Sequence, residues 1–234
     1  MATRERVRVP RAIHIGSRPR TAPGAELSVL VLVEHGPEWF GVDLETGAFL
    51  RVIGTAHLPP PTGRNYRVVG VSVAGEVSSI DPARPELVVA EPVVRDMGSV
   101  RPRRLRRLFS LVAAADRPGA TVLGTRGPSV AYVDLDGSAA SVTMLDARRA
   151  ALELLIDRDI PQLAITFGGV TQRFPVLDGR VVDVARRVYP RSLSGQSLAA
   201  EIGFRPGYVV IGLGEVDGGH VRKFVYALIP RAKG

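Results

Sequence analysis

The chain has 234 residues, 45% of them hydrophobic, which is enough to fill one large domain or two small ones. It contains no cysteine, so disulfides, thiolate catalysis and cysteine-ligated zinc are excluded. The formal net charge is +8, and 29 of the 31 cationic residues are arginines. Its apolar runs are far shorter than the roughly 20 residues that span a bilayer, and no apolar segment follows the charged amino terminus. We therefore expect a cytoplasmic protein with no membrane contact.

Residues 1–24 form a basic arm. They hold six arginines and one glutamate, a net charge of +5, together with prolines and glycines. A short alternation of arginine and valine over residues 6–9 is compatible with one edge strand. We expect this arm to be either flexible or an edge strand.

The next region, residues 25–117, begins with β structure. An apolar run covers 27–33, apolar residues alternate through 38–53, and Glu45, Thr46 and Gly47 supply a turn. Further strands are predicted at 66–73 and 87–94, separated by segments rich in proline and glycine. The pattern over 27–53 indicates a β-meander, and almost all of the first 95 residues are expected to be β structure.

A basic amphipathic helix is predicted at the end of this region, over residues 101–115. Pro102 suits the first helical position, and at 100° per residue the large apolar side chains share one face: Leu105, Leu108, Phe109 and Val112. The opposite face carries four arginines: Arg103, Arg104, Arg106 and Arg107. Residues 101–107 alone have a net charge of +5, so the arm and this segment together account for all of the positive balance.

The last region, residues 118–234, is again rich in predicted strands. Gly168 and Gly169 mark a tight hairpin, and a longer hairpin is expected from 208–216 and 220–229 around Asp217, Gly218 and Gly219. Two short helices are predicted at 181–190 and 194–203. Residues 146–156 are ambiguous, because their alanines favour a helix whereas the surrounding strands favour a strand; we interpret the segment as a helix. The expected fold is mainly β, with α+β as the alternative, built from antiparallel hairpins and meanders in two β subdomains or one mixed body.

One motif raises the question of catalysis. The segment SVAYVDLDGS over 129–138 resembles the first motif of the haloacid dehalogenase-like phosphatases. That resemblance implies Asp134 as nucleophile and Asp136 as acid or base, and it also implies a lysine and a later acidic pair that holds magnesium. The internal lysine, Lys223, has no carboxylate after it. The four histidines share no metal-ligand spacing, so the sequence predicts no metal, no cofactor and no catalytic residue.

We therefore expect a non-catalytic intracellular binding protein rather than an enzyme. Its arginine-rich segments are suited to a polyanion, either RNA or DNA, or to an acidic protein partner, with Arg103, Arg104, Arg106 and Arg107 as the binding residues. The plain alternative is that these arginines form a solvated surface. A structural or assembly subunit, including a homo-oligomer, is a second hypothesis, and a metal-dependent phosphohydrolase around Asp134 and Asp136 is a third.

Overall fold

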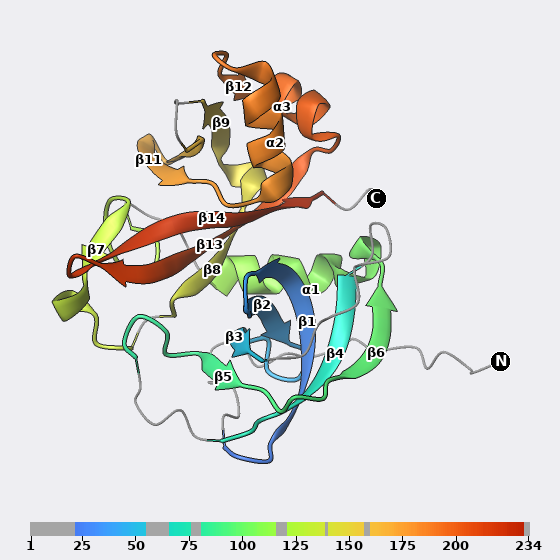
Figure 1. Ribbon diagram of the computed structural model, residues 1–234. Coiled ribbons are helices and arrows are strands. Elements are labelled where there is room, and N and C mark those ends of the chain that lie inside the picture. Colours follow the sequence, from blue (N-terminus) through green and yellow to red (C-terminus); the bar gives the residue numbers. More distant parts are fainter. Residues whose placement is uncertain are drawn as a thin grey trace.

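The computed structural model describes residues 22–54, 66–75, 81–115, 121–138, 140–156 and 160–231. The predicted arm over 1–24 lies almost wholly outside these residues, and so does the predicted boundary near residue 117. Within the described residues, strands outnumber helices and form antiparallel sheets, so the expectation of a mainly β fold with a few short helices is confirmed (Figure 1). No helix in this part of the chain is long and apolar enough to cross a membrane.

The first half of the chain forms a six-stranded sheet in the order β5-β3-β2-β1-β4-β6. Its strands are β1 (Glu26–His35), β2 (Glu38–Asp43), β3 (Phe49–Ile53), β4 (Tyr66–Ser72), β5 (Leu87–Val89) and β6 (Arg95–Val100). Neighbouring strands are antiparallel except β3 and β5, which pair in parallel, Arg51 opposite Leu87. The meander predicted over 27–53 is confirmed in β1, β2 and β3, whereas β4 returns to pair with β1. The parallel pair brings the residue before β5, Glu86, beside Arg51.

The second half of the chain forms two four-stranded sheets. One has the order β7-β14-β13-β8 and consists of β7 (Ser129–Ala131), β8 (Val142–Asp146), β13 (Pro206–Asp217) and β14 (His220–Pro230). The other has the order β11-β10-β9-β12 and consists of β9 (Ala151–Leu155), β10 (Gln162–Phe167), β11 (Val170–Pro175) and β12 (Leu193–Ser194). The long carboxy-terminal hairpin is confirmed, with positive φ angles at Gly218 and Gly219 in its turn.

All three α-helices of the described residues begin and end near the expected positions: α1 (Pro102–Ala115), α2 (Gly179–Val188) and α3 (Gly195–Ile202). The side chain of Asp178 accepts a hydrogen bond from the backbone amide of Arg180 and thereby caps α2. Gly203 ends α3 with a φ of 79°, the left-handed conformation that glycine adopts without strain.

The helix predicted over 146–156 is wrong. Residues 147–149 form one turn of 3-10 helix, and residues 151–155 form β9. Strand β9 is paired on both sides, with β10 and β12, and Leu154 is fully buried. Pairing with two neighbouring strands outweighs the modest helix preference of alanine, because propensity differences amount to only tenths of a kcal/mol, at most about 1 kcal/mol per residue.

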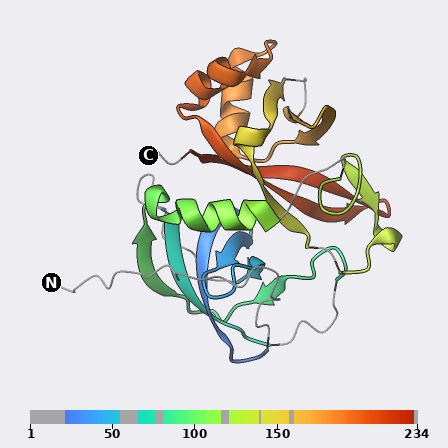
Figure 2. The same cartoon turned by 180° about the vertical axis from the view of Figure 1, so that it is seen from behind.

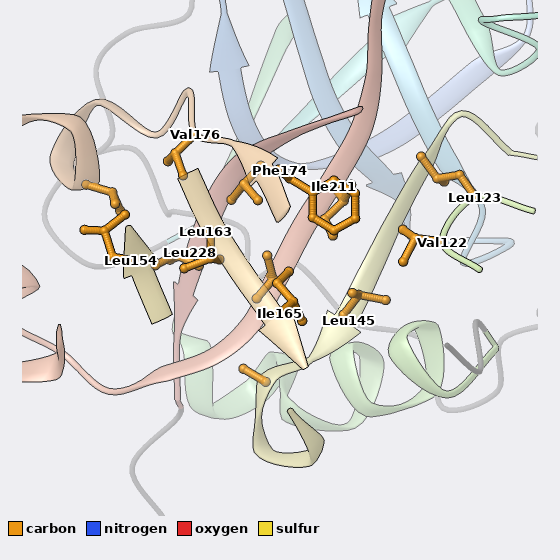
Figure 3. Close-up of a cluster of buried hydrophobic side chains, with 14 of the residues drawn as sticks. Val122, Leu123, Leu145, Leu154, Leu163, Ile165, Phe174, Val176, Ile211 and Leu228 are labelled. Carbon is orange, nitrogen blue, oxygen red and sulfur yellow. The ribbon is translucent and has the colours of Figure 1, made fainter. Parts of the chain in front are cut away.

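The β13–β14 hairpin is buried on both faces. One face packs with β9–β11, α2 and α3, as Figure 3 shows for Ile211 and Leu228 beside Leu163 and Phe174. The other face packs against α1 and the six-stranded sheet, through Val210 and Tyr226 among others. Figures 1 and 2 accordingly show the hairpin as the middle layer of the molecule, between the six-stranded sheet on one side and α2 and α3 on the other.

A buried polar network joins the six-stranded sheet to the second half of the chain. Arg51 is fully buried, and its Nε donates to Oε1 of Glu86 at 3.3 Å. Its Nη2 donates to the carbonyl oxygens of Ser141 and Leu213, and Glu86 also accepts hydrogen bonds from the amide and hydroxyl of Ser141. The guanidinium lies over the ring of Phe40, 4.8 Å from its centroid. Arg51 therefore satisfies buried acceptors on both halves of the chain.

We expect Arg51→Ala to lower the free energy of unfolding by about 3–5 kcal/mol, because it leaves the buried carboxylate of Glu86 without its cation. Urea denaturation followed by circular dichroism measures this loss. Arg186→Ala is the control, since Arg186 and its partner Asp183 are both exposed and should contribute less than about 0.5 kcal/mol. Equal losses in the two variants would contradict the proposed role of Arg51.

Candidate anion-binding surfaces

Helix α1 presents its arginines as the sequence predicts. Arg103, Arg104, Arg106 and Arg107 are all exposed, on the face opposite the buried residues Leu105, Leu108, Phe109 and Val112. Figure 2 shows α1 running across the molecule between the six-stranded sheet and the β8–β13–β14 layer. The structure thus brings the four predicted residues together on one accessible surface.

The apolar face of α1 is held firmly in place. The ring of Phe109 packs edge-on against Tyr66 of β4 and Tyr208 of β13, with centroid distances of 5.5 and 5.4 Å. The hydroxyl of Ser110 lies 3.3 Å from that of Tyr208. These contacts fix the rotation of the helix about its axis, and this rotation directs the arginines outward.

The electrostatics of this surface are unbalanced. Within the described residues, none of the four arginines forms an ion pair, and the first turn of α1 contains no acidic residue. Arg103 and Arg104 lie near the amino-terminal end of the helix, where the macrodipole disfavours cations. Arg103 and Arg107 are four residues apart, a spacing at which like charges destabilise a helix. A bound anion would relieve both effects.

The two aspartates of the phosphatase resemblance lie at the surface. Asp134 is exposed in a turn of 3-10 helix after β7, a three-residue strand that is paired antiparallel to β14. Oδ1 of Asp136 accepts a hydrogen bond from the backbone amide of Ser138 at 2.8 Å. Hydrogen bonds from Ser138, chiefly from its side chain, lower the pKa of Asp136. That shift disfavours the protonated form that a general acid needs. The described residues contain no cluster of His, Asp or Glu that could hold a metal ion.

A second basic surface lies where β14 changes its partner. The edge of β14 that faces away from β13 pairs with β7 as far as Arg222, opposite Ser129. Three residues later, Val225 forms a parallel bridge with Val176, just after β11. Arg173 of β11 also lies three residues before this bridge. Because Ser129 already occupies the edge at Arg222, β11 must diverge from β14 there, and a hollow of about 1040 Å³ opens between β11 and the paired strands β7 and β14.

Three arginines line this hollow, and sequence reasoning missed all of them. They come from the loop before β7, from β11 and from β14: Arg126, Arg173 and Arg222. All three are exposed and form no ion pair within the described part of the chain. Arg126 and Arg173 stand singly, and Arg222 is followed by a single lysine, Lys223, so no run of charge in the sequence indicates them.

Lys223 lies fully buried beside the loop that carries Arg126. Its Nζ donates to the carbonyl oxygens of Thr125 at 2.8 Å and Gly127 at 2.9 Å, which flank Arg126. No carboxylate of the described residues pairs with it. Burial lowers the pKa of Lys223 from 10.5 to about 8, so the side chain is still cationic at neutral pH.

Comparisons of the chain with known protein families, with curated proteins and with solved structures found no match.

The buried cation predicts a dependence of stability on pH. The folded-state pKa of Lys223 is about 8 and its ordinary value is 10.5, so between these pH values the unfolded chain binds a proton that the folded chain has lost. The wild type should therefore gain stability relative to Lys223→Met as the pH rises through this window. Urea denaturation of both proteins across the window measures the difference. Parallel stability curves would show that the buried amine keeps its ordinary pKa.

Proposed function

We propose that the protein binds an extended polyanion, RNA or DNA, through the arginine face of α1. One observation carries the proposal: four exposed arginines share one face of a rigidly packed helix and form no ion pair with any described carboxylate. Guanidinium groups match phosphate oxygens with two parallel hydrogen bonds, so a row of them along a helix suits a phosphate backbone.

The interaction that we propose is electrostatic and weakly selective for sequence. The four side chains project from two successive turns of α1, and Phe109, the aromatic residue of this helix, is buried in the core. Stacking of unpaired bases on the helix is therefore not part of the proposal, and affinity should come mainly from the release of counterions when arginines neutralise phosphates.

The test compares the wild type with a variant in which Arg103, Arg104, Arg106 and Arg107 are all changed to Ala. We expect the wild type to bind mixed-sequence RNA or duplex DNA with an affinity that falls steeply with salt. In the variant, the magnitude of the slope of log K against log salt concentration should decrease for each phosphate that the helix no longer neutralises, by about 0.9 with duplex DNA and about 0.7 with single-stranded RNA. Fluorescence anisotropy over a series of salt concentrations measures both quantities.

The matched control removes four charges elsewhere, by changing Arg95, Arg186, Arg187 and Arg191, all exposed and outside α1, to Ala. This variant should keep nearly all of the affinity and the slope. If both variants lose affinity equally, the binding follows net charge and not α1. If the wild type binds neither nucleic acid, the proposal fails, and the assembly hypothesis is the next to test, by sedimentation at moderate salt.

A further inference from the structure

The hollow between β7 and β11 follows from the strand pairing of β14. Along β14, the pairing partner changes from Ser129 of β7 to Val176, just after β11. This change separates β7 from β11 and leaves space between them. The volume of about 1040 Å³ is slightly above the range for small-molecule sites, roughly 300–1000 Å³. It is larger than an inorganic ion needs.

The charge of this hollow is one-sided. Arg126, Arg173 and Arg222 line it, and no carboxylate of the described residues does. A concave surface lined by charges of one sign concentrates their field and attracts ions of the opposite sign. Lys223 adds a fourth cation from within the protein, where water screens it little.

Lys223 also has a positioning role at this site. Its two hydrogen bonds to the carbonyls of Thr125 and Gly127 hold the backbone on both sides of Arg126. Its own amide donates to the carbonyl of Pro128 at 2.8 Å, which anchors the next part of the same loop on β14. These three hydrogen bonds fix the shape of the loop.

Neutral polar side chains complete the lining. Ser129, Gln162 and Thr171 all border the hollow. Hydroxyl and amide groups of this kind hydrogen-bond the hydroxyls and ring nitrogens of an organic molecule, whereas arginines hold its phosphate. We propose that this hollow is a second binding site, separate from α1, for a small organic molecule that bears a phosphate monoester.

The experiment uses the full chain and three probes that contain phosphate: the monoesters AMP and glucose 6-phosphate, and inorganic phosphate. Isothermal titration calorimetry should detect binding of AMP or glucose 6-phosphate, or both. Adenosine and glucose, which lack the phosphate, should bind at least about tenfold more weakly than the corresponding monoester. Binding of AMP alone indicates a nucleotide as the source of the phosphate, and binding of glucose 6-phosphate alone indicates a sugar phosphate. If neither monoester binds the wild type, or if each binds no better than its unphosphorylated counterpart or inorganic phosphate, the proposal is overturned.

A pair of matched variants locates the site. Changing Arg126, Arg173 and Arg222 together to Gln should weaken binding of the monoester by at least about tenfold. Changing Arg187, Arg191 and Arg205 to Gln removes the same charge from exposed positions outside the hollow and should leave the affinity unchanged. All six residues are exposed, and urea denaturation checks that both variants fold as the wild type does.

The α1 variant provides an independent readout. The protein with Arg103, Arg104, Arg106 and Arg107 changed to Ala should bind the monoester as the wild type does, whatever happens to its binding of nucleic acid. Equal loss of monoester binding in the hollow variant and in either control would overturn the assignment, because it would show attraction by net charge. Binding of a short RNA in the hollow, with no binding of any monoester, would overturn it as well.

Discussion

Burial of both faces of the β13–β14 hairpin is the constraint on which the rest of the structure depends. Alternate residues of β13 belong to different cores: Val209 and Ile211 face β9–β11, α2 and α3, whereas Tyr208 and Val210 face α1 and the six-stranded sheet. A strand that is apolar on both sides must be covered on both sides. Residues from both sides of position 117 therefore share one of these cores, and the hairpin carries the second half of the chain against the first.

The same hairpin places both proposed binding surfaces. Tyr208 contacts Phe109 and so orients α1, whose opposite face then carries arginines into solvent. Along β14, the pairing partner changes from β7 at Arg222 to Val176, just after β11, at Val225, and the hollow lies at this change. A change in the twist or register of the hairpin would thus alter the geometry of both surfaces, although they lie on different elements.

Arginine occurs in three different surroundings in this chain. Arg51 is buried and satisfied by carboxylates and carbonyls, so its charge is a structural element at the junction of the two halves. The α1 arginines are exposed and unpaired within the described residues, and those of the hollow are unpaired and gathered from distant segments. An excess of arginine in the composition is therefore uninformative by itself, because only the surroundings of each side chain show whether its charge is already neutralised.

The sequence by itself determined the hairpins, the three α-helices and the arginine face of α1, because these depend on turn residues, caps and a periodicity that extends over neighbouring residues. Local patterns failed at β9, where pairing with β10 and β12 overrides the helix preference of its alanines. They also could not indicate the ion pair of Arg51 with Glu86, 35 residues away, or the meeting of Arg126, Arg173 and Arg222. Those sites exist only because strands far apart in the sequence become neighbours, and the order of strands in a sheet is decided by the packing of the whole chain.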